Sequence, residues 1–118
     1  MRDRVASFRY AIAGLKRLLA TEHNARLHAF ATVIVVCASI WLDLDRYEWC
    51  WITLAIAMVW FAEAINTAIE RLGDAVTLEQ SAEIGAAKDV AAAAVLIFSI
   101  AAAVIGILIL GPAIWSRS

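Results

Sequence analysis

Three long apolar stretches, separated by short polar segments, constrain the fold of this chain more than any other feature of its sequence. They cover about residues 27–42, 49–69 and 90–110. A helix needs about 20 apolar residues to cross the hydrocarbon core of a bilayer. The first stretch is short, so local thinning of the bilayer or flanking residues must compensate. Because 64% of the chain is hydrophobic, against about 45–50% in soluble domains, we predict one all-α integral membrane domain over residues 1–118.

A shorter amphipathic helix is predicted over residues 2–20. Its apolar residues recur at spacings of 3, 4, 3 and 4 and form one stripe of a helix: Val5, Phe8, Ile12, Leu15 and Leu19. Basic residues lie on its other faces. Such a helix suits the membrane surface, where the stripe enters the acyl boundary and the cations meet anionic headgroups. A helix packed against a soluble partner is the alternative.

Lysine and arginine are distributed unevenly, which predicts the orientation in the membrane. The side holding the N-terminus and the second loop carries Arg2, Arg4, Arg9, Lys16, Arg17, Arg26, Arg71 and Lys88, whereas the other side has Arg46 and Arg117. The positive-inside rule therefore places the N-terminus in the cytoplasm and the C-terminus outside. We expect Gly73 and Gly85 to break the helices of the second loop, and the third span to end at Gly111-Pro112.

The composition excludes several classes of function. With a formal net charge of −1 and no basic tract, the chain lacks the surface that nucleic-acid binding requires. Cys37 and Cys50 have no metal-ligand spacing, so we expect them to be small apolar residues packed in helices. His23 and His28 are interpreted as interfacial polar residues. The polar N-terminus does not predict a cleavable signal peptide.

Glu63 is the first residue that suggests chemistry. It follows 14 uncharged residues in the second stretch, and an ionisable group at the membrane centre costs about 2.5–3.5 kcal/mol. At spacings of 3, 4 and 4 it shares a helix face with Asn66, Glu70 and Asp74. Carboxylate and amide oxygens suit Mg²⁺ that is held partly by substrate phosphates. The alternative is a solvated helix end with Arg71 as the ionic partner.

Two more polar clusters are predicted at the same cytoplasmic interface. One is Lys88-Asp89, in which the lysine can bind phosphate and Asp89 can also interact with the helix dipole. The other is Glu22 with Arg26, which alone would be an ordinary surface ion pair. Phosphoryl transfer needs these parts, namely a metal, a cation and a base. Soluble-kinase motifs are absent, and a transporter using Glu63 as a proton or cation site remains the alternative.

The sequence resembles the prokaryotic diacylglycerol kinase family, which includes the undecaprenol kinases. The resemblance is carried by Glu63-Ala-Ile-Asn-Thr-Ala-Ile-Glu70, then Asp74, then Ala87-Lys88-Asp89-Val-Ala-Ala-Ala-Ala-Val-Leu96, with Glu22-x-x-x-Arg26 upstream. It implies a surface helix and three transmembrane helices, assembled in the inner membrane as a homotrimer with shared active sites. It also implies transfer of the ATP γ-phosphoryl group to a lipid alcohol with Mg²⁺.

The same resemblance implies a role for each matched residue. Glu63 is expected to be the catalytic base near the lipid hydroxyl, with Asn66 and Arg26 in substrate binding. The carboxylates of Mg-ATP binding are Glu22 and Glu70, and the further nucleotide contacts are Lys88, Asp89 and Tyr10. One departure is Gln80-Ser81, where the family often has Tyr-His, so a nucleotide contact is expected to be missing there. Thr67 and the run from Asp89 to Ala92 favour undecaprenol over diacylglycerol as the lipid.

Overall fold

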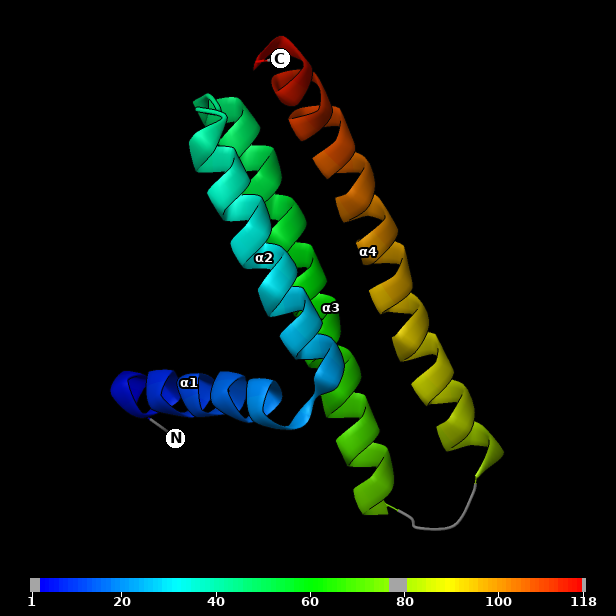
Figure 1. Cartoon of the computed structure of the whole chain (residues 1–118). Coiled ribbons are helices and arrows are strands. Elements are labelled where there is room, and N and C mark those ends of the chain that lie inside the picture. The colour runs from blue at the N-terminus through cyan, green and yellow to red at the C-terminus, as the bar shows by residue number, and fades with distance from the viewer. Residues whose placement is uncertain (1–2, 77–80, 118) are drawn as a thin grey trace.

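The computed structural model describes residues 3–76 and 81–117, and these residues form four helices. The helices are α1 (Arg4–Thr21), α2 (His23–Trp41), α3 (Arg46–Val76) and α4 (Ala82–Arg117). The helix α3 packs against both α2 and α4, whereas α1 runs across the direction of the other three (Figure 1). The described part of the chain is therefore all-α, as predicted, with two helices of 18 and 19 residues followed by two of 31 and 36.

The helix α1 is set apart by the turn that follows it. Its N-terminus is capped by Asp3, whose carboxylate accepts a hydrogen bond of 2.7 Å from the Ala6 N–H. Glu22 then adopts an extended conformation, with φ −111° and ψ 118°, which redirects the chain into α2. The predicted apolar stripe is exposed, and Leu18 is buried. The stripe thus faces away from the other helices and is free to lie on a membrane surface; Arg2, at the predicted start, lies outside the described residues.

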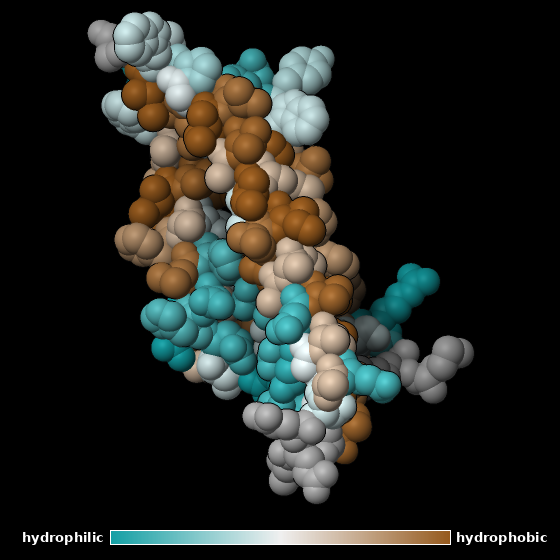
Figure 2. Space-filling view, turned by 90° about the vertical axis from the view of Figure 1, so that its right-hand side faces the viewer, coloured by the Kyte–Doolittle hydropathy of each residue, from teal (hydrophilic) through white to brown (hydrophobic). Residues whose placement is uncertain are grey.

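The helices α2, α3 and α4 are each long and apolar enough to cross a membrane. They contain 19, 31 and 36 residues. At 1.5 Å per residue the two longer helices reach about 46 and 54 Å, so both extend beyond a hydrocarbon core of about 30 Å. Figure 2 shows an apolar band over much of the face that it presents, with polar surface concentrated below. These features define a membrane protein with three candidate spans.

The two glycine breaks predicted for the second loop were wrong, because Gly73 lies inside α3 and Gly85 lies inside α4. The helix α4 continues past Gly111-Pro112 to Arg117, and the end of the third span at these residues stays a prediction. A glycine inside a helix costs about 1 kcal/mol relative to alanine, which packing can offset. At Gly73 a Cβ atom would lie 2.9 Å from Ile84 Cγ2, so glycine permits the close approach of α4. Proline is tolerated in membrane helices where neighbouring groups satisfy the freed backbone.

The turn between α2 and α3 is built from the acidic residues that the sequence places there. Asp43 has a positive φ of 56°, a conformation that short polar residues tolerate. Asp45 and Glu48 form a reciprocal capping box, in which each backbone N–H donates to the other's carboxylate, at 2.9 and 3.0 Å. Two leucines of the turn, Leu42 and Leu44, form a buried apolar cluster with Ile52 of α3. The acidic residues therefore begin α3 and fix the α2–α3 hairpin.

The two cysteines lie on apolar helices, as predicted, but they are exposed within the described residues and not packed. Cys37 on α2 and Cys50 on α3 are free thiols, and both are exposed. Their side chains lie on outward surfaces of the helices, where small apolar groups are compatible with lipid.

Candidate functional site

Glu63 is the most buried charged side chain among the described residues. Only 1% of its surface is exposed, and it lies on α3. Its Oε2 atom accepts no hydrogen bond from the described residues, although the Nε2 atom of His28 on α2 lies 3.5 Å away. A buried polar atom without a hydrogen bond costs about 1–3 kcal/mol. The position therefore marks a place where an incoming donor, such as a hydroxyl group, would satisfy a vacant acceptor.

His28 is the site residue that the sequence interpretation missed. As an interfacial residue it was not connected to Glu63, but the structure brings the two side chains together from different helices. One signal was present in the sequence. His28, Thr32, Val35 and Ser39 follow one another at spacings of 4, 3 and 4, so polar residues recur on one face of an apolar helix.

The polar face of α3 forms as predicted, because the helix runs without interruption from Arg46 to Val76. Asn66 lies one turn beyond Glu63, and its Oδ1 atom is buried with no hydrogen bond among the described residues. Thr67, beside it, is also buried. Two unpaired oxygen acceptors, Glu63 Oε2 and Asn66 Oδ1, thus stand one turn apart on the same helix.

Lys88 connects the far end of this face to α4. Its ammonium group donates a hydrogen bond of 2.6 Å to Asp74 Oδ1 and lies 3.5 Å from Glu70 Oε2. The three residues come from α3 and α4, which approach closely at Gly73. The cation stabilises two carboxylates that would otherwise repel each other at i and i+4. The ionic partner of Asp74 is therefore Lys88, and not Arg71 as in the alternative interpretation of this helix end.

Glu22 and Arg26 are not paired with each other. Glu22 lies 3.8 Å from Arg71, which also donates a hydrogen bond to the hydroxyl of Thr21. Arg26 donates to the backbone carbonyls of Leu19 at 3.0 Å and Ala20 at 2.7 Å. Arg26 therefore caps the C-terminus of α1, where a cation also complements the helix dipole. Glu22 is held towards α3 through Arg71.

The remaining predicted site residues lie on the surface. Tyr10 on α1 and Asp89 on α4 are exposed. Asp89 follows Lys88 directly on α4, but consecutive helix residues do not share a face, so its side chain points away from that of Lys88. Gln80, part of the departure from the expected Tyr-His, lies outside the described residues.

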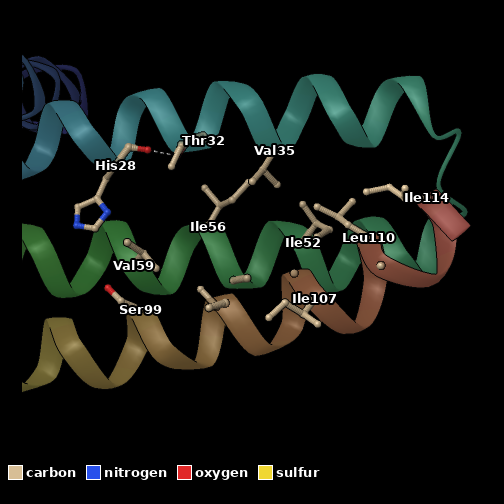
Figure 3. Close-up of a pocket in the computed structure, with 16 residues that line it drawn as sticks. His28, Thr32, Val35, Ile52, Ile56, Val59, Ser99, Ile107, Leu110 and Ile114 are labelled. Atoms are coloured by element: carbon tan, nitrogen blue, oxygen red, sulfur yellow. Dashed lines mark hydrogen bonds between the residues drawn. The ribbon is translucent and has the colours of Figure 1, made fainter.

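An apolar cavity of about 610 Å³ lies between α2, α3 and α4. Figure 3 shows His28 and Ser99 at one end and Leu110 and Ile114 at the other, with aliphatic side chains such as Ile56 between them. Because His28 lines the cavity and also faces Glu63, the apolar space adjoins the buried carboxylate. A molecule with an apolar tail and a polar head would match this arrangement.

The donor set fits Mg²⁺ bound together with a phosphate compound. Within residues 3–76 and 81–117, no three acidic, histidine or cysteine side chains are gathered into a metal site. Mg²⁺ commonly takes only one or two carboxylates, together with waters and substrate phosphates. Of the two carboxylates expected to hold Mg-ATP, Glu70 lies beside Lys88 and Glu22 is held towards α3 by Arg71. Asp74 and the unpaired amide oxygen of Asn66 lie on the same face of α3 as Glu70.

These features define a small helical membrane protein with a polar site at one end of its bundle and an apolar cavity leading to a buried carboxylate. The sequence profile of the prokaryotic diacylglycerol kinase family matches residues 9–110. The chain therefore belongs to this family, a family of lipid kinases, as the resemblance indicated.

Individual relatives cover most of the chain. A diacylglycerol kinase of Synechocystis is 37% identical over 113 residues, which is 95% of this chain and 65% of that protein. The chain thus spans slightly less than two thirds of the Synechocystis protein. An undecaprenol kinase of Bacillus subtilis is 37% identical over 106 residues, or 90% of this chain and 86% of that protein. The diacylglycerol kinase of Escherichia coli K12 is 32% identical over 95 residues, or 80% of this chain and 78% of that protein.

Proposed function

We propose that this chain transfers the γ-phosphoryl group of ATP to the hydroxyl group of a membrane lipid alcohol, with Mg²⁺. The observation that carries the proposal is Glu63, a buried carboxylate with an unpaired oxygen, next to an apolar cavity. A base that accepts the proton of an alcohol must lie within hydrogen-bond reach of it. The cavity suits the apolar part of a lipid, and the position of Glu63 suits the hydroxyl group. Membership of a lipid kinase family supports the same reaction.

One group of residues acts on the lipid, and another group binds the nucleotide. Glu63 accepts the hydroxyl proton as the alcohol oxygen bonds to the γ-phosphorus, the bond to the bridging oxygen breaks and ADP leaves, and Asn66 orients the reacting groups. Glu22 and Glu70 would hold Mg-ATP, and Lys88, Asp89 and Tyr10 contact the nucleotide. Bound Mg²⁺ supplies positive charge that neutralises the phosphates during transfer. Arg26 contributes to substrate binding by fixing the end of α1 beside Glu22.

The ion pairs of Lys88 suggest how the site is held before the nucleotide binds. Without ATP, the lysine balances the charges of Glu70 and Asp74. Bound Mg-ATP would give the carboxylates a second positive partner, and Lys88 would then be free to pair with a phosphate group. Lysine is suited to this exchange because its charge is compact and its stem flexible. The charged groups remain paired in both states.

Among lipid alcohols we favour undecaprenol over diacylglycerol. The support is Thr67, which is buried beside Asn66, and the run from Asp89 to Ala92, which resembles the undecaprenol kinase branch. The relatives include proteins of both names at 37% identity, so overall similarity does not separate the two lipids.

The proposal includes a place in the cell and an assembly. The chain lies in the inner membrane with its N-terminus and its polar site on the cytoplasmic side, as the Lys and Arg distribution favours. It forms a homotrimer with composite active sites. In support, no residue of α4 is buried within the chain, although this helix is the most apolar of the four. Its small residues allow another helix to approach closely.

The buried position of Glu63 also favours a second candidate, a transporter subunit that uses Glu63 as an ion or proton site. Ionisable groups inside membranes are rare, and where they occur they often mark ion or proton pathways. This candidate leaves the cluster of Lys88, Glu70 and Asp74 without a function.

One assay distinguishes the two candidates. The purified chain in lipid vesicles is given Mg²⁺ and ATP labelled at the γ-phosphate, with undecaprenol, diacylglycerol or no added alcohol. The kinase proposal requires a labelled lipid phosphate, most abundant with undecaprenol. If neither alcohol becomes labelled while the chain is correctly inserted, the chain is not a kinase of these lipids. A larger yield with diacylglycerol would reverse the lipid assignment alone.

A further inference from the structure

We infer that His28 is a positioning residue for Glu63, orienting the carboxylate so that it can accept from the lipid hydroxyl as well as from the imidazole, since a carboxylate has acceptor sites for both donors. The inference rests on the proposed role of Glu63 as the base. His28 belongs to α2 and Glu63 to α3, and their side chains are 22% and 2% exposed. Both groups are therefore largely removed from solvent. In the protein interior a single polar contact has a large influence on the orientation of a side chain.

The geometry assigns the contact to particular atoms. His28 Nε2 lies 3.5 Å from Glu63 Oε2, and that oxygen accepts no hydrogen bond from the described residues. The separation exceeds the usual 2.7–3.2 Å of a hydrogen bond. Contacts of this kind are often long in ligand-free enzymes and shorten when substrate binds. A small movement of the imidazole therefore converts the contact into an Nε2–H donation to Oε2.

A second contact, one turn away, holds the two helices in the register that this donation needs. The indole N–H of Trp60 on α3 donates a hydrogen bond of 2.9 Å to Thr32 Oγ1 on α2. The Thr32 hydroxyl in turn donates a hydrogen bond of 2.7 Å to the backbone carbonyl of His28. Trp60 precedes Glu63 by three residues, and Thr32 follows His28 by four. The Trp60–Thr32 contact therefore fixes the backbone of His28 opposite the carboxylate.

The surroundings of His28 argue against a purely structural residue. The ring stands on the wall of the apolar cavity, where Val59 and Ile56 lie nearby (Figure 3). An aliphatic residue would pack there without the penalty of burying an imidazole. The α2–α3 register is already held by Thr32 and Trp60, so packing alone does not require a histidine. What the imidazole adds is a donor next to the buried carboxylate.

The test compares replacements that keep or remove the donor. His28→Leu removes it, whereas His28→Gln keeps an N–H group of similar reach. We expect His28→Leu to lower kcat on the order of 10–100-fold, the scale for residues that orient a reacting group. The KM for Mg-ATP should stay near the wild-type value, because the nucleotide residues are untouched. His28→Gln should recover most of the loss. His23→Leu, at the exposed start of α2, is the matched control and should retain wild-type turnover.

A double-mutant cycle separates positioning from stability. If His28 acts through Glu63, then His28→Leu causes no further loss in a Glu63→Gln background. Repetition of the full loss in that background would overturn the inference, as would wild-type kcat in His28→Leu while Glu63→Gln is impaired. Equal losses for the leucine and glutamine variants would overturn it as well. Near wild-type turnover in Glu63→Gln would instead refute the proposed base, and with it the role of His28.

Discussion

Gly73 controls how closely α3 and α4 approach at the lysine–carboxylate cluster, and replacing it with alanine tests that geometry. The new Cβ would lie 2.9 Å from Ile84 Cγ2 and 3.1 Å from Lys88 Cε. Carbon atoms pack best at about 3.5–4.0 Å, so the methyl group and Ile84 must separate by about 0.6 Å or more. The Lys88 side chain can bend away, but Ile84 and the helix that carries it must shift.

The energetic outcome is a difference between two effects. Overpacking of this kind costs about 1–3 kcal/mol. Alanine is better than glycine inside a helix by about 1 kcal/mol, which offsets part of that cost. We therefore expect Gly73→Ala to destabilise the protein by about 0–2 kcal/mol. Because Lys88 moves with α4, kcat/KM for Mg-ATP should fall on the order of 10-fold, since small misplacements of binding groups slow catalysis strongly.

The assay measures the thermal unfolding midpoint and the steady-state kinetics of matched variants. Gly85→Ala is the control, because nothing lies within 4 Å of a Cβ at that position. This variant should gain up to about 1 kcal/mol from helix propensity and keep its nucleotide kinetics. Ile84→Ala removes the obstructing methyl group, so the double variant Gly73→Ala/Ile84→Ala should recover the kcat/KM for Mg-ATP that Gly73→Ala loses.

Two results would show that Gly73 does not control the approach of α3 and α4. One is Gly73→Ala matching Gly85→Ala in both stability and kcat/KM, which would mean that α3 and α4 do not approach closely there. The other is a failure of Ile84→Ala to change the effect of Gly73→Ala, because residues in contact should show coupling of about 0.5–3 kcal/mol.

Three further predictions concern topology, the metal and the assembly. Reporter fusions at the C-terminus should be active outside the cytoplasm, and activity inside would contradict three crossings. Glu22→Gln and Glu70→Gln should each weaken the apparent affinity for Mg²⁺ or ATP and lower turnover while the protein still inserts; unchanged nucleotide dependence in both would contradict their assignment. Mixed oligomers of Glu63→Gln and Glu22→Gln subunits should regain some activity if sites are shared, and no rescue in proven mixed oligomers would favour sites within single subunits.

Much of the fold could be predicted because it depends on patterns local to each helix. The three apolar stretches and the stripe of the amphipathic helix follow from spacing along the chain, and the structure has a helix at each. The glycine positions could not be predicted in the same way. Gly73 matters because Ile84 of the next helix packs against it. A rule that treats glycine as a local helix break does not include that contact, so it predicted a break where the glycine allows close packing.

In the candidate site, too, features within one helix could be predicted and contacts between helices could not. The face that carries Glu63, Asn66, Glu70 and Asp74 was predictable, because residues three and four apart share a side of a helix. The neighbour of Glu63 from α2 was not, because contact between helices depends on their register. That register is held by a hydrogen bond from Trp60 to Thr32, which no spacing within one helix reveals. His28 was missed for this reason.

Glu63 is proposed to accept the proton of a lipid hydroxyl, and the turnover of Glu63→Gln with saturating Mg-ATP measures that role. Glutamine keeps the size and a hydrogen-bonding oxygen but removes the base. We predict that transfer of labelled phosphate to the lipid falls by a factor on the order of 10²–10⁴, while Mg-ATP still binds. Near wild-type turnover would contradict the claim, and loss of Mg-ATP binding would assign Glu63 to the metal instead.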